Sequence, residues 1–104
     1  MNEELMEISF GLIANAGEAK GLAYDALSKA KAGNFEEAKE LLAEARAEVN
    51  KAHRFQTNLI QAEANGSKNE ISVLLIHSQD HLMNGMTVLD MAEEFINLYE
   101  LVKK

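Results

Sequence analysis

The sequence lacks several residue types, and each absence excludes a class of protein. It has no cysteine, which excludes a disulfide framework, thiol chemistry and a cysteine zinc site. It has no proline, which is compatible with long uninterrupted helices. Tryptophan is absent and only four Phe and two Tyr are present, too few for a base-stacking surface. No run of about 20 apolar residues occurs, so no segment is expected to span a bilayer.

The charge balance narrows the choice of partners. The formal net charge of −7 disfavours nucleic acids and anionic membranes and favours a partner with a basic docking face. The sequence begins Met-Asn-Glu-Glu, an acidic start that differs from the basic and then apolar start of a signal peptide. We therefore expect a cytoplasmic protein, and the 104 residues fit a single domain over residues 1–104.

Apolar residues recur at steps of three and four, which predicts three amphipathic helices. We place these helices at about residues 3–32, 35–64 and 68–103. The first carries a narrow seam of mostly small residues, Leu5, Ile8, Leu12, Ala16, Ala19, Ala23, Ala26 and Ala30. Two short connections then give an all-α, antiparallel up-down-up three-helix bundle.

Two breaks separate the predicted helices. At the first, Gly33 suits the position after a helix end, and Asn34 suits an N-cap with Glu37 as its capping-box partner. At the second, Gly66 ends a helix, and Ser67 with Glu70 predicts the N-cap of the next.

Three glycines interrupt the first helix, at Gly11, Gly17 and Gly21. Each costs about 1 kcal/mol against alanine. They either allow neighbouring helices to pack closely or leave space beside a reactive helix, and the sequence leaves both interpretations open.

The third helix carries apolar residues on more than one side. Besides a stripe with Leu82 and Leu89, it has a second patch at Ile76 and Met83. A single three-helix bundle covers only part of such a surface, so the pattern predicts self-association through this helix.

The same helix holds a polar cluster. At about 100° per residue, His77, Asp80 and His81 fall on one face, away from the apolar stripe. Three interpretations of this spacing remain open: a structural cluster, a metal pair, or a histidine that carries a phosphoryl group covalently. The third histidine, His53, has either a structural role or a supporting role close to His77. No glycine-rich nucleotide loop and no Glu-x-x-His di-iron pattern occurs.

Four segments of the sequence form a recognisable set: NAGEAK at residues 15–20, GNFEEA at 33–38, AHRFQT at 52–57 and LIHSQDHLM at 75–83. Together they resemble the enzyme IIA component of the lactose/cellobiose (diacetylchitobiose) family of the bacterial phosphoenolpyruvate-dependent sugar phosphotransferase system. The last is similar to the family's phosphorylation motif, and the resemblance covers essentially the whole chain. Ser78 stands where the family more often has alanine. We expect little consequence, because a serine hydroxyl can bond back to the carbonyl of Leu74.

The resemblance implies a role for each matching residue. His77 matches the histidine that accepts a phosphoryl group from the phosphocarrier protein HPr and passes it to a cysteine of the cognate enzyme IIB, during uptake of a β-linked disaccharide. Asp80 matches an aspartate that meets its two symmetry mates at the axis of a homotrimer and binds a divalent cation, usually Mg²⁺. Gln79 and His81 are carried over only as supporting neighbours that orient or solvate the phosphate.

Two alternatives belong to other classes. The first is a histidine phosphotransfer module of a two-component relay, which is typically a four-helix bundle with a lysine soon after its histidine. The second is a metal-assembled helical trimer without transfer activity.

Overall fold

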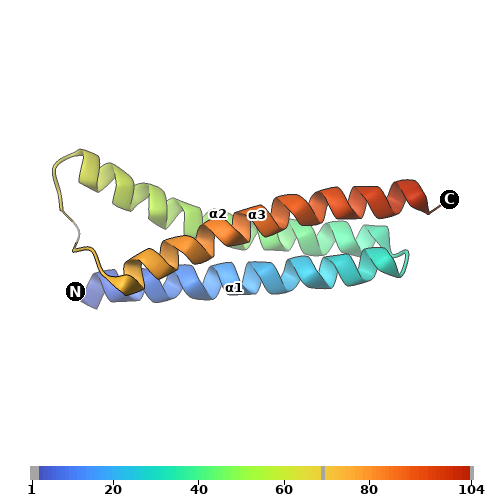
Figure 1. Cartoon of the computed structure of the whole chain (residues 1–104), viewed down its shortest axis with the longest axis horizontal. Helices are drawn as coiled ribbons and strands as arrows, with labels where there is room; N and C mark the ends of the chain where they lie inside the picture. Colours follow the sequence, from blue (N-terminus) through green and yellow to red (C-terminus); the bar gives the residue numbers. More distant parts are fainter. Residues whose placement is uncertain (1–2, 69, 104) are drawn as a thin grey trace.

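Three long helices make up the fold in the computed structural model, which describes residues 3–68 and 70–103. They are α1 (Glu3–Lys31), α2 (Phe35–Ala64) and α3 (Val73–Val102). Figure 1 shows α1 and α3 running in the same direction and α2 running against them. The bundle is elongated, with principal extents of 55 × 21 × 18 Å. The prediction of an all-α, up-down-up three-helix bundle is confirmed.

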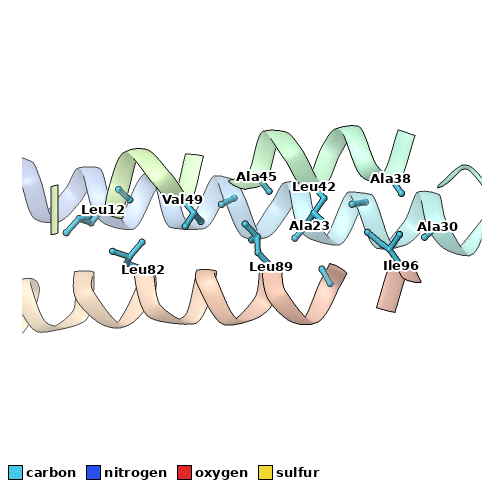
Figure 2. Close-up of a cluster of buried hydrophobic side chains, with 14 residues drawn as sticks. Leu12, Ala23, Ala30, Ala38, Leu42, Ala45, Val49, Leu82, Leu89 and Ile96 are labelled. Atoms are coloured by element: carbon cyan, nitrogen blue, oxygen red, sulfur yellow. The ribbon is translucent and has the colours of Figure 1, made fainter. Parts of the chain in front are cut away.

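The alanine-rich seam of α1 is the centre of the core. All its predicted members are buried except Ile8, which is partly buried, and Ser9 joins them with its hydroxyl bonded to the Leu5 carbonyl at 2.9 Å. α1 packs along both other helices, while α2 and α3 contact each other less. Figure 2 shows the larger side chains of α2 and α3 converging on the small residues of α1. The buried side chains that α2 and α3 contribute include Ala38, Leu42, Ala45, Val49, Ala52, Leu82, Leu89, Ala92 and Ile96.

Small residues also let α1 and α3 approach closely at Gly85. Gly85 is buried on α3, and a Cβ atom built on it would lie 3.6 Å from the Cβ of Ala16. That distance is ordinary van der Waals contact, so the two helices meet here with almost no side chain between them.

Glycine ends both α1 and α2, as predicted. Gly33 and Gly66 have φ of 88° and 100°, a left-handed conformation that residues with a Cβ atom rarely adopt. Asn34 N–H donates to the Lys29 carbonyl at 2.9 Å, and Ser67 N–H donates to the Ala62 carbonyl at 3.0 Å. These six-to-one bonds are the Schellman closure of a helix C-terminus.

The two predicted capping boxes are wrong. Asn34 is the N-cap residue of α2, but its side chain makes no capping bond, and Glu37 pairs instead with Lys29 at 3.1 Å. α3 begins at Val73 rather than near residue 68, and its N-cap is Ser72 rather than Ser67. The Ser72 hydroxyl accepts a hydrogen bond from the Leu75 N–H at 3.1 Å. Because Ser72 satisfies a free N–H group of the first turn, the helix starts there.

Much of the outer surface of α3 is apolar. Its exposed large side chains are Val73, Ile76, Met83, Met91, Phe95, Leu98, Leu101 and Val102. By contrast, ion pairs tie its other edge to α2: Arg46 contacts Asp90 and Glu93, both at 3.3 Å. No helix in the described part of the chain is long and apolar enough to cross a membrane.

The revised start of α3 can be tested with two serines. We expect Ser72→Ala to lower the free energy of unfolding by about 1 kcal/mol, because the Leu75 N–H loses its acceptor. Ser67→Ala is the matched control, since its hydroxyl caps no helix, and we expect a change within about 0.5 kcal/mol. Urea unfolding at one fixed protein concentration measures both, and the reverse order of effects would restore the start near residue 68.

Candidate functional site

The N-terminal half of α3 positions the predicted site. Ser72 fixes where the helix starts, so His77 falls in the second turn and Ser78 turns into the core. The 100° step per residue then places His77 and Asp80 on the outer surface, where both are exposed. The structure thus confirms that these two residues share the outward side of α3, with His81 half-buried beside them.

His77 and His81 form a direct pair, one helical turn apart. Their Nε2 atoms lie 3.0 Å from each other, which is hydrogen-bond distance between two ring nitrogens. The ring centroids are 4.4 Å apart and the ring planes are nearly perpendicular, at 89°. The Nδ1 atom of His81 is buried and has no hydrogen-bond partner in the described part of the chain. The ring of His77 is therefore accessible from outside the bundle, while the half-buried ring of His81 has its hydrogen bond with His77.

Asp80 lies on the same outer side as His77. It is exposed, and it forms no ion pair or hydrogen bond within residues 3–68 and 70–103. Those residues also contain no group of three or more His, Cys, Asp or Glu side chains able to hold a metal ion. One copy of the described chain therefore offers a single carboxylate at this position.

Gln79 points to a different neighbour from the one predicted. Its side-chain oxygen accepts a hydrogen bond from Nε2 of Gln56 on α2, and Gln56 also approaches Met83 Sδ at 3.9 Å. The Gln56–Gln79 hydrogen bond thus links α3 to α2 within one chain, while His77 pairs with His81. Sequence reasoning missed Gln56, although it lies in the AHRFQT segment; the only signal was its place in that segment.

Ser78 is fully buried, and its hydroxyl donates to the carbonyl of Leu75 at 2.7 Å. The predicted acceptor, the carbonyl of Leu74, is wrong by one residue. The i−3 carbonyl receives the bond, a geometry that serine also adopts within helices. The hydroxyl therefore faces into its own helix and not toward the ring of His77.

Within the described residues, no hydrogen bond joins the remaining sequence candidates to the His77–His81 pair. His53 is exposed on α2, and no hydrogen bond within the described residues joins it to His77. Gly11, Gly17 and Gly21 are also exposed, and a Cβ atom built on any of them would meet nothing within 4 Å. Close packing inside the bundle is therefore the wrong explanation for these glycines; Gly85 has that role.

Comparison with known proteins identifies the class. Residues 7–100 match the family model described as "PTS system, Lactose/Cellobiose specific IIA subunit". The chain belongs to this family of phosphotransferase components. Membership of this family, rather than a two-component relay module, is therefore the interpretation of the helix-borne histidine.

The sequences of individual relatives are similar to this chain over nearly its full length. The lichenan-specific phosphotransferase enzyme IIA component of Bacillus subtilis is 50% identical over 98% of this chain and 93% of its own length. The N,N'-diacetylchitobiose-specific EIIA component of Escherichia coli K12 is 45% identical over 97% and 87%.

Two solved structures share the fold. The cellobiose-specific enzyme IIA of Bacillus anthracis superposes with a TM-score of 0.94 at 51% identity, covering 99% of this chain and 94% of its own. The chitobiose IIA protein of Escherichia coli, solved as a complex with HPr, gives 0.85 at 43% identity, covering 99% and 100%.

The serine within the motif can be tested directly. We expect Ser78→Ala to change the free energy of unfolding by less than about 1 kcal/mol, because the Leu75 carbonyl keeps its helical partner and only a small hydroxyl is lost. Ser78→Leu, which forces three more carbons into the α1–α3 contact, should cost about 1–3 kcal/mol. Thermal or urea unfolding of both variants compares the two costs, and a large loss in Ser78→Ala would contradict the assigned hydrogen bond.

Proposed function

We propose that this chain is a cytoplasmic phosphocarrier in which His77 receives a phosphoryl group from phospho-HPr. His77 then donates the group to a cysteine of the cognate enzyme IIB, during uptake of a β-linked disaccharide. The observation that carries the proposal is an exposed, paired His77 on α3 within the LIHSQDHLM segment. Family membership and the HPr complex of a relative with the same fold support it.

The chemistry needs only a free ring nitrogen and an approachable surface. The lone pair of one His77 nitrogen forms a bond to phosphorus while the bond between phosphorus and the donor's leaving atom breaks and its electron pair returns to the donor. No nucleotide loop is required, because the donor protein brings the phosphoryl group already activated. The acidic surface, with a net charge of −7, steers a partner that has a basic face.

We further propose that three copies assemble through the outer face of α3. The exposed apolar residues Ile76, Met83, Met91 and Leu98 fall within about 80° of one another around the helix axis. Asp80 lies in the same sector, between Ile76 and Met83. Because an isolated chain leaves this stripe in water, association with like stripes would bury it.

A divalent cation fits this assembly and does not fit a single chain. Three Asp80 carboxylates meeting at a threefold axis would repel one another, and together they offer six oxygen ligands, a number that suits Mg²⁺. Asp80 from each copy would hold the ion, and the ion would supply compensating positive charge.

The carrier role is tested by labelling. After incubation with phosphoenolpyruvate, enzyme I and HPr, we expect intact mass to show a single acid-labile phosphoryl adduct on the wild type. His77→Ala should show none, with its helical content unchanged. His53→Ala, which removes another exposed histidine, should label normally. Labelling of His77→Ala would contradict the assignment of His77 as the phosphoryl acceptor. If neither the wild type nor any variant shows an adduct although the partner proteins are active, the result would favour a trimer without transfer activity.

The assembly is tested at Asp80. We expect a chelator to weaken the wild-type trimer, and Asp80→Leu to keep or strengthen the trimer without the ion, because buried like charges become apolar packing. Asp90→Leu is the matched control, because Asp90 lies on the other edge of α3, where it pairs with Arg46 of α2. We expect the trimer of this variant to stay sensitive to the chelator. Sedimentation at several protein concentrations measures both, and an Asp80→Leu protein that is monomeric throughout would remove Asp80 from the axis.

A further inference from the structure

The chain contains two Asn-Gly steps, and the fold places them in very different backbone settings. They are Asn65–Gly66, directly after α2, and Asn84–Gly85, in the middle of α3. Both asparagine side chains are exposed to water. An asparagine before glycine is chemically reactive, because glycine has no Cβ atom to hinder its own backbone nitrogen from reaching the side-chain amide carbon. The reacting groups of the two steps are therefore the same, and only the backbone around them differs.

The first step lies in the turn that ends α2, at one end of the bundle (Figure 1). Asn65 is the C-cap residue, and Gly66 donates its N–H to the carbonyl of Glu63 at 3.1 Å. A Cβ atom built on Gly66 would meet nothing within 4 Å. Because the ends of helices fray at a small cost in free energy, this hydrogen bond opens readily. The nitrogen of Gly66 is then free, in a space with no crowding from neighbouring atoms.

The second step is held by the helix and by the core. Gly85 lies inside the hydrogen-bonded ladder of α3 and is buried. A Cβ atom built on it would lie 3.6 Å from the Cβ of Ala16 on α1. To free the nitrogen of Gly85, the helix would have to break and also separate from α1, which is close to unfolding the domain. The fold therefore protects Asn84, although its side chain is exposed.

We propose that Asn65 is a site of spontaneous deamidation in the folded protein and that Asn84 is not. The backbone nitrogen of Gly66 attacks Cγ of Asn65 and a new C–N bond forms. The bond from Cγ to Nδ2 breaks, and ammonia leaves with the hydrogen that was on the Gly66 nitrogen. Water then opens the cyclic imide. Opening at Cγ gives aspartate, and opening at the main-chain carbonyl carbon gives isoaspartate. Solvent water is the only co-reactant.

The two products differ in what they do to the end of α2. Both add a negative charge at the end of the helix where the aligned peptide dipoles are already negative. Isoaspartate also inserts one extra carbon into the main chain between residues 65 and 66. The hydrogen bonds donated by Gly66 and Ser67 close the helix and depend on the present spacing. Isoaspartate therefore loosens the last turn of α2, whereas aspartate leaves the path of the main chain unchanged.

The first test follows both asparagines in the full-length protein over time in warm, mildly alkaline buffer. Peptide mass spectrometry after digestion in acid shows conversion as replacement of an NH group by oxygen. We expect Asn65 to convert at least about tenfold faster than Asn84, because opening a packed helix costs far more than fraying its end. In guanidinium chloride, where the chain is unfolded, both should convert at similar rates. Equal rates in the folded protein would overturn the proposal, as would a folded Asn65 that stays intact while the unfolded one converts.

The second test separates the effect of charge from that of the extra carbon. Asn65→Asp has the charge of both products and an unaltered main chain, so it is the matched control. In ¹H–¹⁵N spectra of incubated wild type, the isoaspartate form has its own signals. We expect the Gly66 and Ser67 amides of that form to exchange with solvent about tenfold faster than in Asn65→Asp, the size of one hydrogen bond. Equal exchange in the two would contradict the loosened turn.

A further variant confirms that the modification belongs to Asn65. Asn65→Gln keeps a side-chain amide, but its ring closure would need a larger and slower-forming ring. We expect this variant to show no conversion at position 65 over the time in which the wild type converts, and circular dichroism checks that it is folded. Conversion at the same rate as in the wild type would overturn the attack by the Gly66 nitrogen. None of these measurements involves His77, so they stand or fall independently of the carrier function.

Discussion

The contact of α1 with its two neighbours is the constraint on which the rest of the structure depends. Five of the buried positions along α1 are alanines, from Ala16 to Ala30. Small side chains let both other helices approach closely. The larger buried side chains that face the seam are few: Leu42 and Val49 from α2, and Leu82, Leu89 and Ile96 from α3. Such a thin core has no room for all the apolar residues of α3. The exposed stripe around Asp80 and the buried face through Leu82 and Leu89 are thus two results of one packing arrangement.

That arrangement also separates the tasks of neighbouring residues on α3. Ser78 is in the core, Gln79 bonds to α2, His77 and Asp80 are exposed, and His81 lies between core and surface. Five consecutive residues cover more than a full helical turn, so they meet several different environments. Because the helix is continuous, these residues keep fixed positions relative to one another. The exposed His77 therefore keeps the half-buried His81 beside it.

Much of this could be predicted from sequence. The seam of α1, the glycine ends of α1 and α2 and the polar face of α3 depend on periodicity and on local backbone preference, which a sequence displays directly. The start of α3 could not, because Ser67 and Ser72 both resemble N-caps and only the fold decides which of them meets a free N–H. The role of Gly11, Gly17 and Gly21 stayed open because periodicity does not show what faces a residue. The His77–His81 distance and the Gln56–Gln79 bond depend on side-chain rotamers and on contacts between helices, which spacing alone does not encode.

The late start of α3 has a consequence for the charge that His77 would carry. The first turns of α1 and α2 contain acidic side chains, Glu3 and Glu4 or Glu36 and Glu37, whereas the first turn of α3 contains none. His77 lies four residues after Val73, about 6 Å along the axis, and helical side chains lean toward the N-terminus. The aligned peptide dipoles present a partial positive charge at that end, worth about 0.3–1 kcal/mol to a nearby anion. Had the helix begun near residue 68, this field would be more than a turn further away. The N-cap serine, Ser72, thus sets the distance between this partial positive charge and the exposed ring of His77.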